Sequence, residues 1–382
     1  MPINNPLHYD ACIIAFGNIK NDARALNIAR VLNQMNYRVS IVAFGNDLDK
    51  AELLKENIDF FPIKQSIHKR LWRRWLFFIF NFRKLKNDLK SKTYWSEDFY
   101  SLYPSIKLQR QFDGKIIYDS REIYSALGPL YKDPIKQKIL SFLENKWAGK
   151  ADSILVSGDL DKTYLEKYFD KKKPVTVVYN YPPYKNVIKN DFLRVNYKIP
   201  YSASILLYQG MILKGRGLYK VISSLNFLPD VYFCLLGDGS DIEDLRHFAI
   251  DSGLQNRVIF CGKVDYDTLH EITCSADAGV SLIEPISFSY SLALPNKMFE
   301  YCMARIPCLT SNLPAMKAII DQYEIGEYIE HDSKPEDIAR KIRLLLTNKD
   351  KYKNKCNQAA LSLNFGSQME VIRTIIKTNL EI

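Results

Sequence analysis

Lys297 and Glu300 carry the strongest chemical signal in the sequence, because they are opposite charges in an otherwise apolar segment. They lie three residues apart in LPNKMFEYCMARIP (294–307), and this spacing places both on one face of a helix. Pro295 and Asn296 precede them and are typical of a helix start. The segment therefore predicts a helix that begins at Asn296 and carries two charged side chains near that end.

A helix start of this kind could bind a nucleoside diphosphate. Free backbone N–H groups and the positive end of the helix dipole attract phosphate, and Lys297 adds a formal charge. Glu300 can accept hydrogen bonds from the two ribose hydroxyl groups. This combination suits a nucleotide sugar. The alternative is a buried helix with a surface Lys–Glu pair, which stabilises many helices.

A glycine-rich segment upstream could supply further phosphate contacts. Residues 210–217 read GMILKGRG and hold Lys214 and Arg216 between glycines, which allow the backbone to approach a ligand closely. The alternative is a solvated loop. Gly237 and Gly239 follow an apolar run and precede a helical pattern, although GDG by itself is also an ordinary turn.

Several segments together resemble glycosyltransferase family 4 and related enzymes of the GT-B fold. The resemblance covers nearly the whole chain, and its segments are 21–42, 117–123, 208–217, 235–239, 257–264, 275–285 and 294–314. It implies a retaining glycosyltransferase that moves a sugar from a nucleotide-diphosphate sugar, with UDP- or GDP-sugars first among the donors. The acceptor would be a hydroxyl group of a glycan or lipid-linked molecule, in cell-surface polysaccharide or glycolipid synthesis.

The resemblance also assigns roles to individual residues. Donor binding is implied for Gly17, Gly210, Arg216, Gly237, Gly239, Val264, Asn296, Lys297 and Glu300, with the backbone near Val264 contacting the base. Acceptor binding is implied for Arg24 and Asp119, and catalysis for Arg121 and Glu122. The sequence has no convincing Asp-x-Asp metal motif, and basic groups can stabilise a diphosphate leaving group, so we expect metal-independent chemistry and no tightly bound cofactor.

Two positions depart from the family pattern. Leu292 stands where many members have a first glutamate, eight residues before Glu300. Arg121 stands where many members have a histidine, and a guanidinium cannot shuttle a proton near neutral pH. Arg121 could instead hold a phosphate or an acceptor anion, which would leave Glu122 as the only nearby carboxylate of its loop; Asp119 and Glu122 could equally be structural.

These departures keep two rival functions open. A sugar-nucleotide epimerase of the same architecture would need acids, bases and histidines around one sugar, and none of the five histidines lies in a matching motif. A non-catalytic partner that binds a nucleotide sugar in a membrane glycosyltransferase complex would explain both Leu292 and Arg121.

The elements that position these residues form two α/β domains. The chain has 382 residues, 47% of them hydrophobic and 25% charged, which is typical of two soluble globular domains. Alternating strand and helix patterns predict two Rossmann-like, doubly wound parallel-sheet domains facing a cleft. The expected boundaries are 1–185 for the N-terminal acceptor-binding domain and 200–361 for the C-terminal nucleotide-sugar-binding domain. By the resemblance, 362–382 is a helix that crosses back to the first domain.

Strand patterns can be placed in each half. They are 11–16, 38–44, 115–118, 153–157 and 175–179 in the first half, and 205–208, 232–236, 258–261, 279–283 and 308–310 in the second. Ligands of open parallel sheets bind beyond the carboxyl ends of the strands, so the candidate residues should gather there.

Residues 64–92 carry most of the net charge of +10, with ten Lys or Arg against the single acid Asp88. Aromatic and aliphatic side chains recur there at helical spacing, and the predicted stripe is Trp72, Trp75, Leu76, Ile79 and Phe82. Basic residues beside an aromatic stripe favour a helix that lies on an anionic membrane surface. The alternatives are a helix packed on the first domain and a nucleic-acid site. No nucleic-acid-binding motif supports the latter, and nucleic acid is not expected as a partner.

Cysteine usage and hydropathy favour a cytoplasmic protein. The seven cysteines are scattered without a CxxC pair, the N-terminal residues lack a signal-peptide pattern, and no apolar run approaches the roughly 18 residues of a membrane span. We therefore expect a cytoplasmic protein that associates peripherally with the inner face of the membrane.

Overall fold

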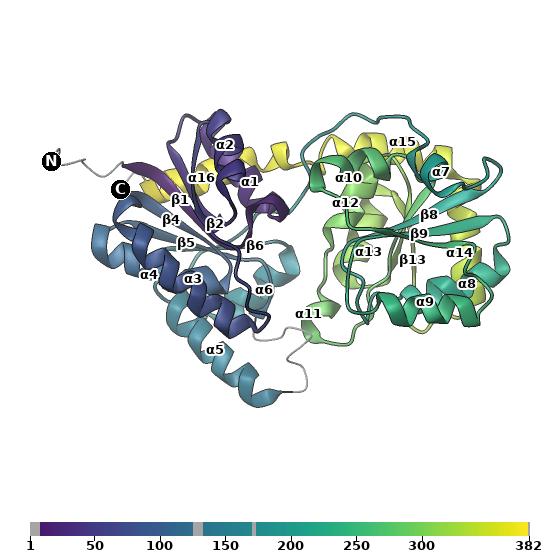
Figure 1. The fold of residues 1–382 in the computed structure, drawn as a ribbon, viewed down its shortest axis with the longest axis horizontal. Helices are drawn as coiled ribbons and strands as arrows, with labels where there is room; N and C mark the ends of the chain where they lie inside the picture. Colours follow the sequence, from purple (N-terminus) through teal and green to yellow (C-terminus); the bar gives the residue numbers. More distant parts are fainter. Residues whose placement is uncertain (1–7, 125–132, 170–172, 381–382) are drawn as a thin grey trace. The chain divides into compact units, whose positions relative to one another are not determined.

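The computed structural model describes residues 8–124, 133–169 and 173–380, and the chain forms two compact units (Figure 1). The first unit comprises Met1–Asn180 and Gln368–Ile382, and the second comprises Tyr181–Ser367. The sequence suggested boundaries near 185, 200 and 362. Each unit is built around its own parallel sheet.

The first sheet has the strand order β3-β2-β1-β4-β5-β6-β7 within the described residues. The chain moves outward from β1 to β3, returns to pair β4 with β1, and then continues to β7, so the direction of winding reverses between β1 and β4. The strands are β1 (Tyr9–Asn18), β2 (Val39–Phe44), β3 (Ile58–Ile63), β4 (Ser91–Glu97), β5 (Lys115–Ser120), β6 (Ser153–Val156) and β7 (Val175–Val177).

Helices cover both faces of this sheet, which is why its central strands are buried on both sides. In Figure 1, α3, α4 and α5 lie on one side of the sheet and α1 and α16 lie together on the other. The α-helices are α1 (Ala23–Gln34), α2 (Asp47–Lys55), α3 (Leu71–Leu85), α4 (Phe99–Phe112), α5 (Pro134–Ala148), α6 (Asp159–Tyr168) and α16 (Met369–Leu380).

The second sheet repeats this arrangement with the order β10-β9-β8-β11-β12-β13. Winding reverses between β8 and β11, which pair directly. The strands are β8 (Ser204–Gln209), β9 (Val231–Leu236), β10 (Val258–Gly262), β11 (Ala278–Ser281), β12 (Cys308–Ser311) and β13 (Gly326–Ile329).

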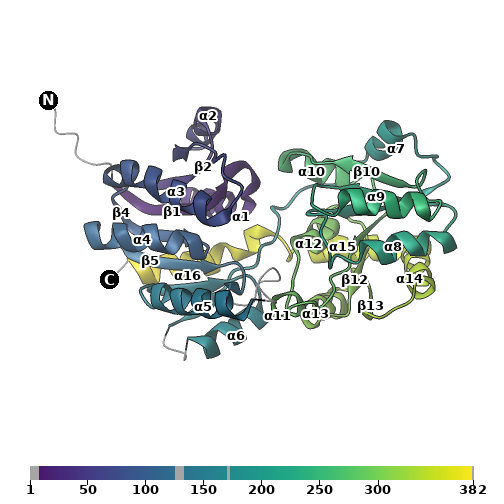
Figure 2. The same cartoon turned by 60° about the horizontal axis from the view of Figure 1, so that its bottom comes forward.

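The helices of the second unit surround this sheet, as Figure 2 shows from a second direction. They are α7 (Phe192–Tyr197), α8 (Leu218–Ser224), α9 (Ile242–Asp251), α10 (Tyr266–Thr273), α11 (Phe288–Ser291), α12 (Asn296–Met303), α13 (Pro314–Tyr323), α14 (Pro335–Thr347) and α15 (Lys349–Ala360). The prediction of two doubly wound parallel-sheet α/β units is confirmed.

Strands β3, β4 and β13 were not predicted from the sequence. Strand β3 contains Pro62, and proline is rarely found in a central strand. The structure is compatible with this proline because β3 lies at the edge of its sheet. Strand β4 begins inside the basic segment 64–92, whose helical pattern obscures it. This omission matters, because β4 ends with Glu97.

The predicted stripe on α3 is only partly correct. Ile79 and Phe82 are buried in the core together with Phe78, and Trp75 donates a hydrogen bond to the Tyr100 carbonyl oxygen, with an N···O distance of 2.9 Å. By contrast, the stripe members Trp72 and Leu76 are 55% and 51% exposed, as is Phe80 at 60%. The helix therefore packs on the first unit through one face and exposes a second apolar row.

Helix α16 belongs to the first unit although it ends the described chain. It contacts α1 and β4, and the Asn379 amide donates a 3.1 Å hydrogen bond to the Ser153 hydroxyl group. Residues from the end of the sequence thus complete the N-terminal fold.

Candidate functional site

Tyr301 fixes α12 against the carboxyl ends of β8 and β11. Its hydroxyl oxygen lies 3.1 Å from the carbonyl oxygens of Leu207 and Val280 and accepts a hydrogen bond from the Gln209 N–H at 3.2 Å. Gly279 makes room for the ring, because a Cβ there would lie 2.4 Å from it. The helix begins at Asn296, as predicted, so its first two turns are held at the end of the sheet where ligands of such folds bind.

Lys297 lies in the first turn of α12, directly over an aromatic ring. Its Nζ is 3.7 Å from the centroid of the Tyr208 ring. Gly210 has a φ of +119°, and a Cβ there would lie 3.3 Å from the same Nζ, so glycine allows the loop and the ammonium to approach each other. Burial, together with the Arg216 guanidinium, lowers the pKa of Lys297 well below its ordinary value.

Arg216 lies between two glycines with positive φ, Gly215 and Gly217. Its guanidinium carbon is 4.7 Å from the centroid of the Tyr290 ring. Among the described residues, no carboxylate lies within ion-pair distance of Arg216 or Lys297. Both cations therefore rest on aromatic faces, and the Glu300 charge acts on Lys297 only from beyond ion-pair distance.

Glu300 is oriented by a short chain of hydrogen bonds. The Gln209 amide donates to Glu300 Oε2 at 2.5 Å, and the Thr273 hydroxyl donates to Gln209 Oε1 at 2.8 Å. Burial raises the pKa of Glu300, while the hydrogen bond from Gln209 and the charge of Lys297 oppose that shift. A cavity of about 20 Å³, enough for about one water molecule, lies beside Glu300. Gln209 and Thr273 were not identified as site residues from the sequence, because nothing in their spacing links them to Glu300.

Gly237 and Gly239 bring two strand-end loops together. A Cβ at Gly237 would lie 2.0 Å from the Gly210 carbonyl oxygen, and one at Gly239 would lie 1.9 Å from the Ile212 carbonyl oxygen. The loops after β8 and β9 therefore require both glycines for their own packing. A ligand contact at either position stays a prediction.

The remaining donor candidates of this unit lie at the same edge of the sheet. Val264 follows the end of β10 and is half-buried, and Asn296 is exposed at the start of α12. Leu292 directly follows α11, which ends at Ser291, and is half-buried, so the position of the missing family glutamate lies between α11 and α12.

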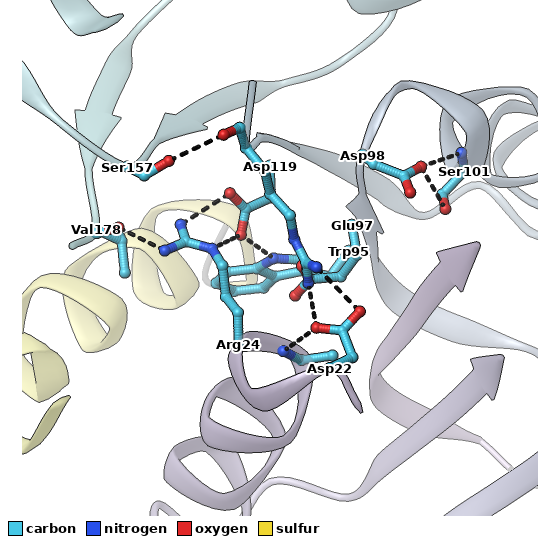
Figure 3. A network of polar contacts seen from close by, with 11 residues as sticks. Asp22, Arg24, Trp95, Glu97, Asp98, Ser101, Asp119, Ser157 and Val178 are labelled. Atoms are coloured by element: carbon cyan, nitrogen blue, oxygen red, sulfur yellow. Dashed lines mark hydrogen bonds and ion pairs between the residues drawn. The ribbon is translucent and has the colours of Figure 1, made fainter. Parts of the chain in front are cut away.

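In the first unit, the candidate residues belong to a network of buried charges (Figure 3). Arg121 donates two hydrogen bonds to Asp22, at 3.0 and 2.8 Å, and also contacts Glu97. Asp22 in turn caps α1 by accepting a hydrogen bond from the Ala25 N–H at 3.1 Å. The carboxylates that contact the Arg121 guanidinium, Asp22 and Glu97, thus come from other segments of the chain and not from the loop that holds Glu122.

Arg24 and Asp119 form the most deeply buried ion pair of this network. Arg24 donates two hydrogen bonds to Asp119, both at 2.8 Å, and a third to the Val178 carbonyl oxygen at 2.6 Å. The Trp95 indole also donates to Asp119, at 3.3 Å. The two charged side chains are 2% and 0% exposed, so they hold α1, β5 and the end of β7 together; a contact with an acceptor stays a prediction.

Glu122 and Gly17 lie at the margin of the network. The Glu122 side chain is exposed, and its charge is among the causes that raise the pKa of Asp161 to about 7, after burial. Gly17 lies near the end of β1, where a Cβ would be 3.4 Å from Asp22 Oδ2, an ordinary contact distance. Gly17 is thus close to the Arg121–Asp22 pair.

Glu97 and Asp98 were not identified as candidate residues from the sequence, because β4, the strand that ends at Glu97, was not predicted. Glu97 lies beside Asp119 in the pairing of β4 with β5, and burial raises its pKa. Asp98 has a φ of 114°, caps α4 through the Ser101 N–H, and has its pKa raised to about 7, chiefly by burial. The run TYWSED, rich in β-branched and aromatic residues before two acids, was the available signal.

Comparison with known proteins places the second unit in a family. Residues 189–362 match the model of the family described as Glycosyl transferases group 1. The second unit is a group 1 glycosyltransferase domain. The match contains every donor candidate of the second unit.

A curated relative agrees with this domain assignment. Over 94 residues the chain is 31% identical to the lipopolysaccharide core biosynthesis glycosyltransferase LpsE of Rhizobium meliloti (strain 1021). The alignment covers 25% of this chain and 27% of that protein.

Solved structures match over nearly the whole length of both chains. Sucrose-phosphate synthase from Thermosynechococcus elongatus has a TM-score of 0.78 at 12% identity, with 97% of this chain and 98% of that chain covered. Anabaena HepE, in complex with UDP and glucose, has a TM-score of 0.72 at 14% identity, with coverages of 97% and 100%. The glycosyltransferase domain and the first unit together therefore have the GT-B fold.

Among the described residues, no helix combines the length and apolar character needed to cross a bilayer. Within the same ranges, no three or more His, Cys, Asp or Glu side chains are grouped so that they could hold a metal ion.

Proposed function

We propose that the protein is a retaining glycosyltransferase that moves a sugar from a nucleotide-diphosphate sugar to a hydroxyl group of a glycan or lipid-linked acceptor. The observation that carries this proposal is the arrangement at the end of the second sheet. Lys297 and Arg216 lie there without a carboxylate partner, and Glu300 is oriented by Gln209.

The arrangement suits the chemistry of a diphosphate leaving group. When the bond between the sugar carbon and the phosphate oxygen breaks, negative charge develops on the diphosphate. Lys297, Arg216 and the N-terminus of α12 would stabilise that charge, and Glu300 would accept hydrogen bonds from the ribose diol. The acceptor oxygen would form the new bond on the same face of the sugar, and its proton would pass to the departing phosphate oxygen. We propose that this chemistry needs no metal ion.

The relatives support the choice of donor and acceptor class. HepE was solved with UDP and glucose, so a UDP-sugar is the first donor to test, and a GDP-sugar is the second. LpsE is described as an enzyme of lipopolysaccharide core synthesis, which supports a cell-surface glycan or glycolipid as the product class.

A non-catalytic partner that binds a nucleotide sugar is the rival proposal. Two observations favour it. Leu292 replaces the first glutamate of the family, and Arg121, which cannot act as a base, is engaged by Asp22 and Glu97. Slow hydrolysis of a bound nucleotide sugar would distinguish an enzyme from a binding protein.

The first experiment measures binding of UDP, GDP, ADP and CMP by calorimetry, followed by hydrolysis of the sugar nucleotide with the preferred base. Glu300→Gln keeps the shape of the side chain but removes its charge, so we expect nucleoside-diphosphate affinity to fall about tenfold, within the range for charge-assisted hydrogen bonds. A 2′,3′-dideoxy nucleotide should lose a similar factor on the wild type. Equal binding of the dideoxy and parent nucleotides would refute the role of Glu300, and binding without any hydrolysis would favour the rival.

We also propose that the protein works at the cytoplasmic face of an anionic membrane, where a lipid-linked acceptor would be available. The exposed row of Trp72, Leu76 and Phe80 on α3 supports this proposal. Basic side chains lie against that row: the Arg73 guanidinium is 5.1 Å from the Trp72 ring centroid, and the Lys84 ammonium is 5.0 Å from that of Phe80. Apolar insertion combined with basic flanks is the physical basis of interfacial binding.

Co-sedimentation with anionic vesicles tests this association. The triple variant Trp72→Ser, Leu76→Ser, Phe80→Ser should lose most vesicle binding, because its apolar row can no longer insert. The exposed residues Leu48 and Leu54 of α2 provide a matched control, and their replacement by serine should leave binding unchanged. A wild type that stays in the supernatant even at low salt would make α3 a purely structural helix.

A further inference from the structure

A groove between the C-terminal half of α3 and the α4 residues from Tyr103 to Gln111 combines an apolar floor with three cations. Its volume is about 300 Å³. Phe82, Tyr103 and Pro104 form the floor, and Arg83, Lys86 and Lys107 form the rim. We call these residues the basic groove. None of the described residues that line it is acidic.

The three rim cations have no carboxylate partner among the described residues. Neither Arg83 nor Lys86 takes part in an ion pair there, and the Lys107 ammonium lies 5.2 Å from the Tyr103 ring centroid. The only amide of the lining, Gln111, already donates a 3.0 Å hydrogen bond to Asn87. An anion in the groove would therefore supply the charge that its rim lacks.

The groove lies away from the edge of the sheet that carries the Arg121 network. Helix α4 starts at Phe99, directly after β4 ends at Glu97, and runs back toward the start of β5 at Lys115. Tyr103, Pro104 and Lys107 follow the first turn of this helix, and the groove residues of α3 come shortly before β4 begins at Ser91, so the groove extends toward the amino-terminal edge of the sheet. A molecule in the groove would not reach the carboxyl ends of the strands, so it would be a docking ligand and not the reacting acceptor group.

From these features we infer that the basic groove binds an anionic phospholipid of the membrane. The phosphate contacts Arg83, Lys86 and Lys107, and the first methylene groups of an acyl chain pack on Phe82 and Tyr103. A volume at the lower end of the roughly 300–1,000 Å³ range of small-molecule sites accommodates the headgroup end of the lipid only. The exposed row of α3 continues along the same helix. The inference rests on the proposed membrane association and gives it a specific lipid site.

Calorimetry without a bilayer tests this site on the full chain. The ligands are dihexanoyl phosphatidylglycerol below its micelle concentration, dihexanoyl phosphatidylcholine, and inorganic phosphate. The expected result is that the anionic lipid binds at least tenfold more tightly than either of the other two. Equal affinity for both lipids would overturn the inference. Equal affinity for inorganic phosphate would reduce the groove to a free-anion site and would also overturn it.

Two charge-matched variants locate the binding. The groove variant Arg83→Gln, Lys86→Gln, Lys107→Gln should lose at least tenfold in affinity for the anionic lipid. The control variant removes the same charge from exposed residues elsewhere on the first unit and should keep wild-type affinity; its substitutions are Lys50→Gln, Lys55→Gln and Lys167→Gln. Equal losses in both variants would mean unspecific attraction and would contradict a built site.

Further measurements separate this site from the other proposals. The thermal transition of the groove variant shows whether it folds. If it does not, the single variants Arg83→Lys and Lys107→Gln are compared instead. Arg83→Lys keeps its charge and should keep its affinity for the anionic lipid, whereas Lys107→Gln should lose affinity for that lipid. The groove variant should retain wild-type nucleotide binding, so a failed lipid site leaves the glycosyltransferase proposal standing. The Trp72, Leu76, Phe80 variant should still bind the short-chain lipid, so the lipid site and vesicle insertion can fail independently.

Discussion

The carboxyl edges of the two sheets both carry buried or half-buried charges, but they arrange them differently. In the first unit, Arg24 and Arg121 each contact carboxylates directly, with Arg24 making two 2.8 Å bonds to Asp119. In the second unit, Lys297 and Arg216 rest on the rings of Tyr208 and Tyr290 instead.

This difference decides what each edge can do. An anion that approaches Arg24 must displace a carboxylate that is already bound, at the cost of leaving that carboxylate buried and unpaired. An anion that approaches Lys297 or Arg216 supplies a missing counter-charge and relieves the repulsion between the two cations. The first edge is therefore built for rigidity, and the second has the available charges that the proposed phosphate site needs.

The largest effect should come from breaking a pair in the first unit. Arg24→Ala leaves Asp119 buried without its partner, so the free energy of unfolding should fall by about 3–5 kcal/mol. All four tryptophans, at positions 72, 75, 95 and 147, lie in the first unit, so tryptophan fluorescence during urea unfolding reports on this unit.

Arg30 on the same helix provides the control for that measurement. Its ion pair with Glu56 is 43% and 38% exposed, so Arg30→Ala should lower the free energy of unfolding by only about 0–1 kcal/mol. If the two variants lost the same stability, the contrast between paired and solvated charges would not hold.

The next largest effect should be on donor binding in the second unit. Lys297→Ala and Arg216→Ala should each weaken nucleoside-diphosphate binding by at least tenfold, because each removes a charge-assisted contact of about 1.5–3 kcal/mol. Lys214→Ala removes a charge from the same loop, but that side chain is 77% exposed and should matter little. Calorimetry that finds unchanged affinity in both variants would remove the proposed site.

A third effect, which appears only when the pH is varied, should be a pH dependence of stability that arises in the first unit. Burial raises the pKa of Asp98 from 3.8 to about 7, so between these values the folded protein binds a proton that the unfolded chain has lost. The resulting stability is complete below about pH 4 and is lost as the pH rises through 7. Asp98→Asn keeps a side chain that can cap α4 but cannot titrate.

The measurement is urea unfolding of both proteins from pH 4 to 8. The stability of Asp98→Asn relative to the wild type should increase steadily over this range, while the exposed control Asp88→Asn should follow the wild type. A difference that stays constant with pH would mean that Asp98 is already ionised throughout.

Much of the secondary structure of the second unit could be predicted from local patterns in the sequence. The helix that carries Lys297 and Glu300 begins at Asn296, because proline and asparagine before an apolar run favour a helix start. The alternation of strands and helices likewise gave the fold class, since the periods of 2 and 3.6 residues are properties of short segments.

Contacts between distant segments could not be obtained in this way. Arg24 and Asp119 are 95 positions apart, and Arg121 and Asp22 are 99 apart, so their pairing depends on the order of the strands. The same holds for α3. The residue pattern predicted an apolar helix, but the neighbouring strands and helices decided that Phe78 and Phe82 are buried and Trp72 is exposed.

The sequence by itself thus determined the two α/β units, the start of α12 and the residue types near the ends of the second sheet. Only the tertiary structure decided which charges are neutralised and which remain available, as Arg121 and Lys297 illustrate. The physical reason is that helix and strand patterns depend on neighbours in the chain. The state of a charge depends instead on partners that folding brings within a few ångströms, whatever their separation in sequence.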